Sequence, residues 1–170
     1  MAVRAEDRLL AISEDQDGYF AIRDAVAAGI SAVHVQQLLA RGRIERLSRG
    51  VYRLRRYPAS PHGDLWAAAL WPRGNADVRA VLSHETALLL HGGTDANPAS
   101  IHVTVPKGSR IGRQPTPPLV LHYADLQASE IDHVDGLPVT TPERTLSDLR
   151  ADAAMLRFAD EFERALEARK

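Results

Sequence analysis

The order of breaks in the first 57 residues constrains the fold more than any other feature of this sequence. Three short helical segments are followed at once by two β-prone runs. Residues 3–14 have helical character and end before Asp17-Gly18. The next apolar residues are Phe20, Ile22, Ala25, Val26 and Ala28. Their three- and four-residue spacing predicts a second helix, which Gly29 stops as a C-terminal cap.

A third helix is predicted from Ser31, a good N-cap, to Gly42, which closes it. Its inward face is formed by Val35, Leu38 and Leu39, and its outward positions are Ala32, His34, Gln36, Gln37 and Arg41. Two helices joined by a short glycine-containing turn, the second with polar outward positions, form a helix-turn-helix arrangement.

The two β-prone runs, residues 43–47 and 51–54, flank a glycine-containing turn at 48–50. This pattern predicts a β-hairpin. A basic hairpin that directly follows the second helix of a helix-turn-helix is the wing of a winged helix, with apolar side chains inward and arginines toward phosphates. The sequence therefore predicts an N-terminal winged helix-turn-helix.

Positive charge is concentrated in the same region. The whole chain has a formal net charge of −1, whereas residues 31–57 hold seven arginines and one acidic residue, a local charge of +6. Several cations held on one face suit the phosphate backbone of DNA, because the counterions that they release favour the complex. A solvated arginine-rich surface is the alternative.

The best candidates to touch base edges are Ser31, His34, Gln36 and Gln37. A glutamine can pair bidentately with adenine, and a helix N-terminus fits the major groove. Phosphate contacts, which supply affinity without sequence information, are expected from Arg41, Arg43, Arg46 and Arg49. The full set of predicted DNA-binding residues is Ser31, Ala32, His34, Gln36, Gln37, Arg41, Arg43, Arg46, Ser48, Arg49 and Arg53. For any single polar residue, a merely solvent-facing position is the alternative.

A second domain is predicted over residues 58–170, after a first domain of residues 1–57, because the stretch 57–61 contains two prolines and has linker chemistry. Helices are predicted at 62–71, from an N-cap at Ser83 to Gly92, and from 141–143 onward. Strands are predicted at 101–105 and 119–123, and a turn at Asp135-Gly136. An apolar stripe over 155–166 either closes this domain's core or pairs with its copy in a dimer.

The predicted fold class is α+β, an N-terminal winged helix-turn-helix followed by a small mixed α/β C-terminal domain. Between the two predicted strands of the second domain, the loop 106–118 carries Lys107, Arg110 and Arg113. This loop could reach DNA or a partner, and a plain mobile connection is an equal alternative.

Composition excludes several classes of protein. The absence of cysteine rules out disulfides, thiolate catalysis and cysteine-bound zinc. No apolar run is long enough to cross a bilayer, so a cytoplasmic location without membrane contact is expected. His84 and His91 are too far apart on one helix to share a metal ion, and no phosphate-cradling loop, nucleophile elbow or nuclease pattern is present. We therefore expect no catalytic residues, no metal and no cofactor.

Five strings of the sequence, which span most of the chain, resemble the AbiEi family of bacterial antitoxin-type transcriptional regulators. They are GYF at 18–20, GRIERLSRGVYR at 42–53, LSHETA at 82–87 with LHG at 90–92, IHVTVP at 101–106, and GLPVTTPERT at 136–145. The resemblance implies an N-terminal winged helix that binds and represses the promoter of its own operon. It also implies a C-terminal domain that, in type IV toxin-antitoxin pairs, opposes a nucleotidyltransferase toxin without forming a stable complex with it.

Two features depart from the family. Ala21 stands where relatives tend to carry a threonine-type helix cap, a loss of roughly 1 kcal/mol, and the chain ends soon after the helix predicted from 141–143. The expected function is an autoregulating repressor and antitoxin that binds double-stranded promoter DNA. Because one protein of this size covers a half-site, inverted repeats bound by a homodimer or by several copies are expected. The alternatives are a lone winged-helix regulator without a toxin partner and a protein-interaction module without DNA binding.

Overall fold

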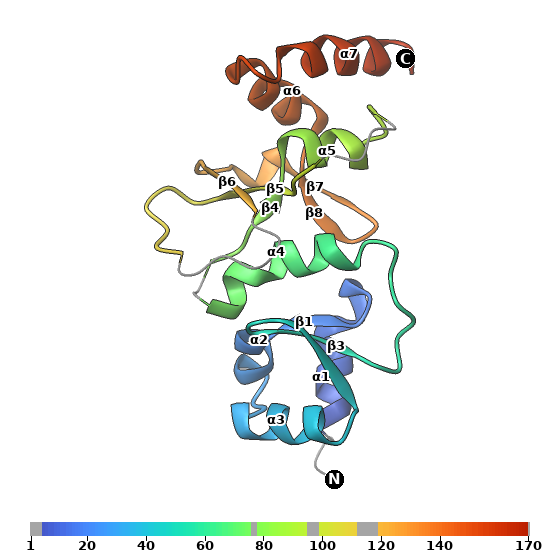
Figure 1. The fold of residues 1–170 in the computed structure, drawn as a ribbon, viewed down its shortest axis with the longest axis vertical. Coiled ribbons are helices and arrows are strands. Elements are labelled where there is room, and N and C mark those ends of the chain that lie inside the picture. The colour runs from blue at the N-terminus through green and yellow to red at the C-terminus, as the bar shows by residue number, and fades with distance from the viewer. Residues whose placement is uncertain (1–4, 76–77, 95–98, 112–118, 170) are drawn as a thin grey trace. The chain divides into compact units, whose positions relative to one another are not determined.

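The structure contains two compact units. The computed structural model describes residues 5–75, 78–94, 99–111 and 119–169 (Figure 1). Contacts between residues divide the chain into a first unit built mainly on Met1–Arg79 and a second built on Ala80–Ser109 and Thr116–Lys170. Both units contain helices and strands, which confirms the α+β class. Within the described residues, no helix has the length and apolar character that a bilayer crossing requires.

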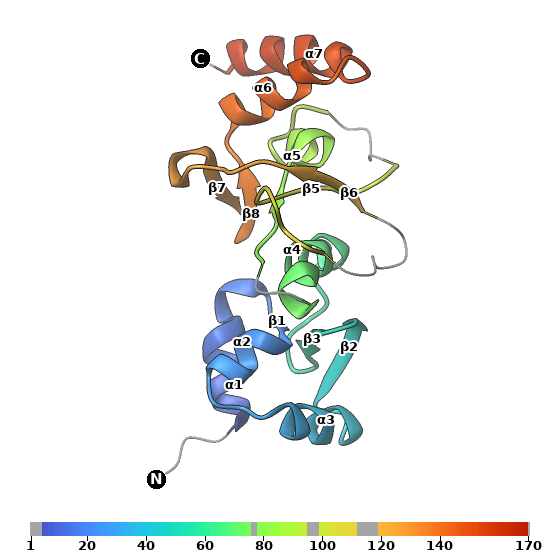
Figure 2. The same ribbon diagram turned by 90° about the vertical axis from the view of Figure 1, so that its left-hand side faces the viewer.

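The first unit packs short helices on a three-stranded sheet (Figure 2). Its elements are α1 (Ala5–Ser13), the 3-10 turn η1 (Glu14–Gln16), β1 (Tyr19–Ala21), α2 (Ile22–Ala27), α3 (Ala32–Ala40), β2 (Ile44–Ser48), β3 (Val51–Leu54) and α4 (Gly63–Asn75). The strands are antiparallel in the order β1-β3-β2. The three helices and the hairpin predicted from the sequence are present, and the Ser31 hydroxyl caps α3 by accepting a hydrogen bond from the His34 amide at 3.2 Å.

Strand β1 was not predicted, and the assignment of Phe20 to a helix is wrong. Positive φ angles at Asp17 and Gly18 turn the chain before β1, and the Gly18 carbonyl accepts a hydrogen bond from the Leu54 amide at 2.9 Å. Phe20 then lies opposite Tyr52 of β3, and their rings stack at 5.7 Å. Helix α2 therefore begins only at Ile22, with Ala21 at its N-cap and no side-chain cap.

Helix α4 packs on the first unit, so this unit extends to Arg79 instead of ending at residue 57. The Trp66 indole donates a hydrogen bond to the Asp17 carboxylate at 3.2 Å and stacks on the Tyr19 ring at 6.2 Å. Farther along α4, Arg73 forms an ion pair with Asp24 of α2 at 2.9 Å. The proline-rich stretch before α4 is thus a connection within one unit.

The second unit is a mixed five-stranded sheet with helices beside it. Its elements are β4 (Val81–Leu82), α5 (His84–Leu90), β5 (His102–Val105), β6 (Val120–Tyr123), the 3-10 turn η2 (Ala128–Glu130), β7 (Ile131–Val134), β8 (Leu137–Thr140), α6 (Pro142–Ala151) and α7 (Leu156–Glu167). The strand order is β6-β5-β4-β8-β7. β4 pairs parallel with β8 and β5 parallel with β6, whereas β4-β5 and β7-β8 are antiparallel.

The C-terminal helices close the core of the second unit. Thr141 caps α6 by accepting a hydrogen bond from the Arg144 amide, and Pro142 occupies the first turn. On α7, Ala159 and Phe162 are fully buried against Leu88 and Leu149. The apolar stripe of α7 therefore completes its own unit, which is the first of the two outcomes expected for it. The turn predicted at Asp135-Gly136 connects β7 to β8.

Candidate nucleic-acid interface

Helix α3 turns one side to solvent along its whole length. Val35 and Leu38 are buried in the core of the first unit. The exposed residues are Ala32, Val33, Gln36, Gln37, Ala40 and the C-cap Arg41. The face is uncharged until Arg41, so it can approach base edges without burying an unpaired charge.

The polar residues predicted on α3 differ in their burial and in the hydrogen bonds that they make within the protein. The Ser31 hydroxyl is used as the helix cap, and His34 is half-buried. The Gln36 amide donates a hydrogen bond to the hydroxyl of buried Tyr52 at 3.2 Å, which joins α3 to β3. Gln37 is exposed and makes no side-chain hydrogen bond within the described part of the chain. Among the candidates, Gln37 is therefore the most available to a base.

The β2-β3 hairpin has the form predicted for a wing. A bulge lies between Arg46 and Ser48, and the turn at Arg49-Gly50 has a positive φ of 76° at the glycine. Arg46 and Arg49 are exposed near this turn, and Arg46 donates a hydrogen bond to the Ser48 carbonyl at 3.3 Å. Ser48 itself is half-buried. The tip of the hairpin therefore presents two guanidinium groups to solvent.

Arg43 and Arg53 have carboxylate partners within the first unit. Arg43 makes two hydrogen bonds to Glu6 of α1, at 2.9 and 3.1 Å, and these raise the pKa of the Arg43 guanidinium. Arg53 is half-buried, pairs with Glu45 at 2.6 Å and lies over the Tyr19 ring. Both therefore hold the unit together, a role that the sequence pattern did not indicate.

The exposed arginines around α3 and the hairpin, apart from Arg43 with its Glu6 partner, form a set that we call the arginine rim. It consists of Arg41, Arg46, Arg49, Arg55 and Arg56. Arg55 and Arg56, which directly follow β3, were counted in the local charge but not among the predicted contacts. The predicted contact loop, residues 106–118, is described only in part. Lys107 and Arg110 are exposed, whereas Arg113 lies outside the described residues.

A helix-turn-helix whose second helix faces solvent, followed by a basic hairpin, defines a winged-helix regulator of the DNA-binding class. The comparisons with known families agree. Residues 7–55 match a family model described as a transcriptional regulator, AbiEi antitoxin, and residues 79–170 match the AbiEi antitoxin C-terminal domain. The second match covers over half of the chain, so this protein belongs to the AbiEi antitoxin family.

Similarity to solved structures is confined to the fold. A crystal structure of the RV2827C protein from Mycobacterium tuberculosis matches with a TM-score of 0.52 and 14% sequence identity. The match covers 91% of this chain and 63% of that one, so this chain spans less than two thirds of that protein. No curated protein matches. The matched families are described as antitoxins and regulators, not as enzymes.

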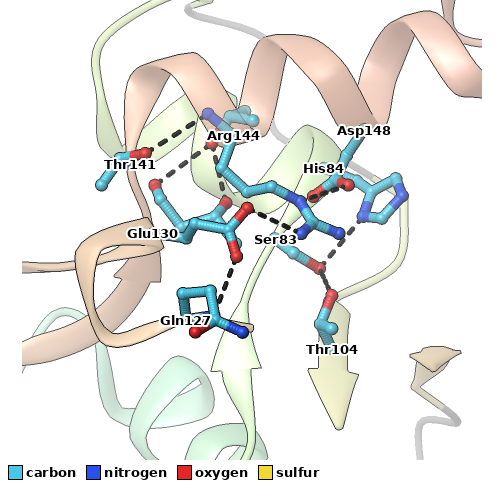
Figure 3. Close-up of polar contacts among 10 residues, drawn as sticks. Ser83, His84, Thr104, Gln127, Glu130, Thr141, Arg144 and Asp148 are labelled. Carbon is cyan, nitrogen blue, oxygen red and sulfur yellow. Dashed lines mark hydrogen bonds and ion pairs between the residues drawn. The ribbon is translucent and has the colours of Figure 1, made fainter. Parts of the chain in front are cut away.

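The second unit contains a buried polar cluster that sequence reasoning largely missed (Figure 3). Ser83 occupies the N-cap position of α5, as predicted, but its side chain makes no capping hydrogen bond. Its hydroxyl instead accepts a hydrogen bond from Thr104 at 2.8 Å and lies 3.0 Å from Nδ1 of His84. Ser83 is fully buried, so in this conformation it cannot reach a substrate as a nucleophile.

Three histidines from separate elements stack beside this serine. His84 has a positive φ of 52°, which is uncommon for a residue other than glycine, and its ring centroid lies 3.4 Å from that of His122. Nδ1 of His102 lies 3.0 Å from Nε2 of His122. No group of side chains that could hold a metal ion is found among the described residues. The three histidines are far apart in the sequence, so no local pattern could predict that they stack.

This histidine stack predicts acid sensitivity of the second unit. Burial, with His122 and His102 nearby, lowers the pKa of His84 to about 3, and burial also lowers the pKa of His102 and His122. Unfolded histidines take up protons near pH 6.5. Below that pH the unfolded state binds more protons, so the free energy of unfolding should fall as the pH drops toward the folded pKa values.

The measurement is amide hydrogen exchange of the second unit between pH 6.5 and 5, with rates corrected for intrinsic exchange. Hydrogen bonds with the Gln127 backbone and Arg144 lower the pKa of Glu130. In this pH range, however, Glu130 contributes little to the pH dependence of the free energy of unfolding. His84→Asn should flatten the dependence, because asparagine tolerates positive φ and does not titrate. The control is His133→Asn, at an exposed position on β7. An equally steep dependence in His84→Asn would contradict this explanation.

Arg144 of α6 connects the other half of the cluster (Figure 3). Its guanidinium donates to Asp148 at 2.8 Å and to Glu130 of η2 at 3.0 Å. Burial acts to lower the pKa of Arg144, but these hydrogen bonds outweigh it and raise the pKa. Burial raises the pKa of Asp148 in spite of Arg144, and Oδ2 of Asp148 has no hydrogen-bond partner within the described residues. Arg144 is thus the main partner of a desolvated carboxylate.

Proposed function

We propose that this protein represses the promoter of its own operon by binding DNA through α3 and the hairpin. In the same proposal it acts in the cytoplasm as the antitoxin of a type IV toxin-antitoxin operon and opposes a nucleotidyltransferase toxin. The observation that supports DNA binding is the arginine rim beside the uncharged exposed face of α3. Membership of the AbiEi family supports the antitoxin role.

In the proposed complex, the N-terminal part of α3 enters the major groove and the hairpin lies along the phosphate backbone. Gln37 contacts a base edge, with Ser31, Ala32, His34 and Gln36 close to the groove. The arginine rim contacts phosphates, which fix the register on the duplex but carry no sequence information. One copy covers a half-site, so two or more copies on inverted repeats would occupy the promoter.

The experiment is a footprint of the purified protein on its own upstream region, followed by a salt titration of the affinity. If each of the five arginines of the rim neutralises one phosphate, the logarithm of the affinity should fall with the logarithm of the salt concentration with a slope of about −4 to −5. A flat salt response, or a protein that protects no DNA, would contradict the proposal and would favour a protein-interaction module.

Growth rescue tests the antitoxin part separately. Co-expression with a nucleotidyltransferase encoded beside this gene should restore the growth of cells that the enzyme inhibits. The variant with Arg46→Ala and Arg49→Ala should still rescue growth although its repression is weakened, because the antitoxin activity is proposed for the second unit. A gene without such a neighbour, or a failure to rescue, would leave the lone regulator as the function.

A further inference from the structure

Val33, on the first turn of α3, is the most exposed large hydrophobic side chain in the described part of the chain. It is 68% exposed, compared with 52% for Val26 of α2. Single exposed apolar side chains are ordinary on protein surfaces, so exposure alone indicates nothing. The position is more informative, because each helical residue turns the chain by about 100°, which places Gln37 and Ala40 on the same side as Val33, one and two turns further on.

Val33 therefore lies at the centre of the exposed face of α3, opposite the buried Val35 and Leu38. No carboxylate is present on this helix, and Ala40 is small enough to let its backbone approach a groove. The hydrogen bond from Gln36 to Tyr52 joins the helix to β3 of the hairpin. The position of Val33 relative to the hairpin arginines is thereby restrained.

We propose that Val33 contacts the C5-methyl group of a thymine in the major groove and so helps to determine the DNA sequence that the protein selects. This inference rests on the proposed function. In the major groove, thymine alone among the four unmodified bases presents a methyl group, and an apolar side chain distinguishes it by excluding water from that methyl. Valine has no donor or acceptor, so the methyl is the feature of a base edge that it can recognise.

The test pairs a protein variant with the removal of a single methyl group. The full-length protein first selects its preferred duplex from a pool of random sequences. Each thymine of that duplex is then replaced in turn by deoxyuridine, which lacks only the C5-methyl. At one thymine of each half-site, wild-type affinity should fall about fourfold, the loss expected when one buried methyl group returns to water.

Val33→Ala should bind the thymine duplex about as weakly as the wild type binds the deoxyuridine duplex, with little further loss when both changes are combined. The change is at an exposed helical position where alanine is well tolerated, so the fold should persist, and circular dichroism checks this. The matched control is Val26→Ala, which removes the same atoms from the neighbouring exposed valine. In this control, replacing the thymine by deoxyuridine should still reduce the affinity by the full amount seen with the wild type.

Two results would overturn the inference, and they are distinguishable. Tight, salt-dependent binding with no loss at any deoxyuridine position, or an undiminished loss in Val33→Ala, would refute the role of Val33 and leave DNA binding intact. A protein that selects no duplex at all would refute both this inference and the proposed function.

Discussion

Replacing Arg46 and Arg49 together by alanine is expected to weaken binding to every duplex by about thirtyfold. The estimate assumes that each guanidinium contributes about 1 kcal/mol through a hydrogen bond to a phosphate oxygen. The slope of the logarithm of the affinity against the logarithm of the salt concentration should also become shallower by about two, because two fewer counterions are released. Since neither arginine is proposed to read a base, the preference between sequences should not change. Electrophoretic mobility shifts at several salt concentrations, on the selected duplex and on an unrelated one, measure all three effects.

The matched control removes an arginine that already forms an ion pair within the first unit. The double variant Glu6→Ala and Arg43→Ala takes away one positive and one negative charge, so the net charge is unchanged, and it deletes the pair at 2.9 Å between α1 and the start of the hairpin. Its effect on DNA affinity should be small. A comparable loss in the variant with Glu6→Ala and Arg43→Ala would show that arginines outside the arginine rim also determine binding.

Arg144→Ala is expected to destabilise the second unit by about 3 kcal/mol, as when one partner of a buried ion pair is removed. The estimate is at the low end for such pairs because 21% of the Arg144 side chain remains exposed. The loss arises mainly from Asp148, whose carboxylate would stay desolvated without its cation. Adding Asp148→Asn should therefore recover part of the stability, because the buried charge is then gone.

The control for Arg144 is Arg150→Ala on the same helix. Arg150 forms an even shorter pair with Glu163 at 2.6 Å, but its side chain is 49% exposed, so less than about 1 kcal/mol should be lost. Both tryptophans belong to α4, so their fluorescence follows only the first unit. Hydrogen exchange of the second unit is the suitable measurement. Similar losses in the two variants would contradict the assigned role of Arg144.

Local signals were sufficient to predict much of the first unit. The Ser31 cap, the spacing of Val35 and Leu38, and the glycine-centred hairpin are all read from neighbouring residues, and each is present. Strand β1 could not be found in this way, because a three-residue strand is defined by its pairing with β3 more than thirty positions later. Tertiary pairing there overrides the helical pattern of the sequence.

At the candidate interface too, features that depend on neighbouring residues could be predicted, and features that depend on residues distant in the sequence could not. The excess of arginine was evident from the sequence, but the identity of each partner was not. Glu6 lies on α1, far along the chain from Arg43, and Glu45 meets Arg53 only because β2 and β3 pair in one particular register. The histidine stack likewise depends on the order of strands in the second sheet, which no short window of sequence specifies.

The position of α4 has a practical consequence for any fragment intended to represent the DNA-binding part alone. A polypeptide that stops at Tyr57 would lack the indole that covers Tyr19 and donates to Asp17. It would expose aromatic surface to water and leave Asp24 without Arg73. A fragment extending through Arg79 retains these contacts. It is therefore the fragment to express when the DNA-binding part is studied without the rest of the chain.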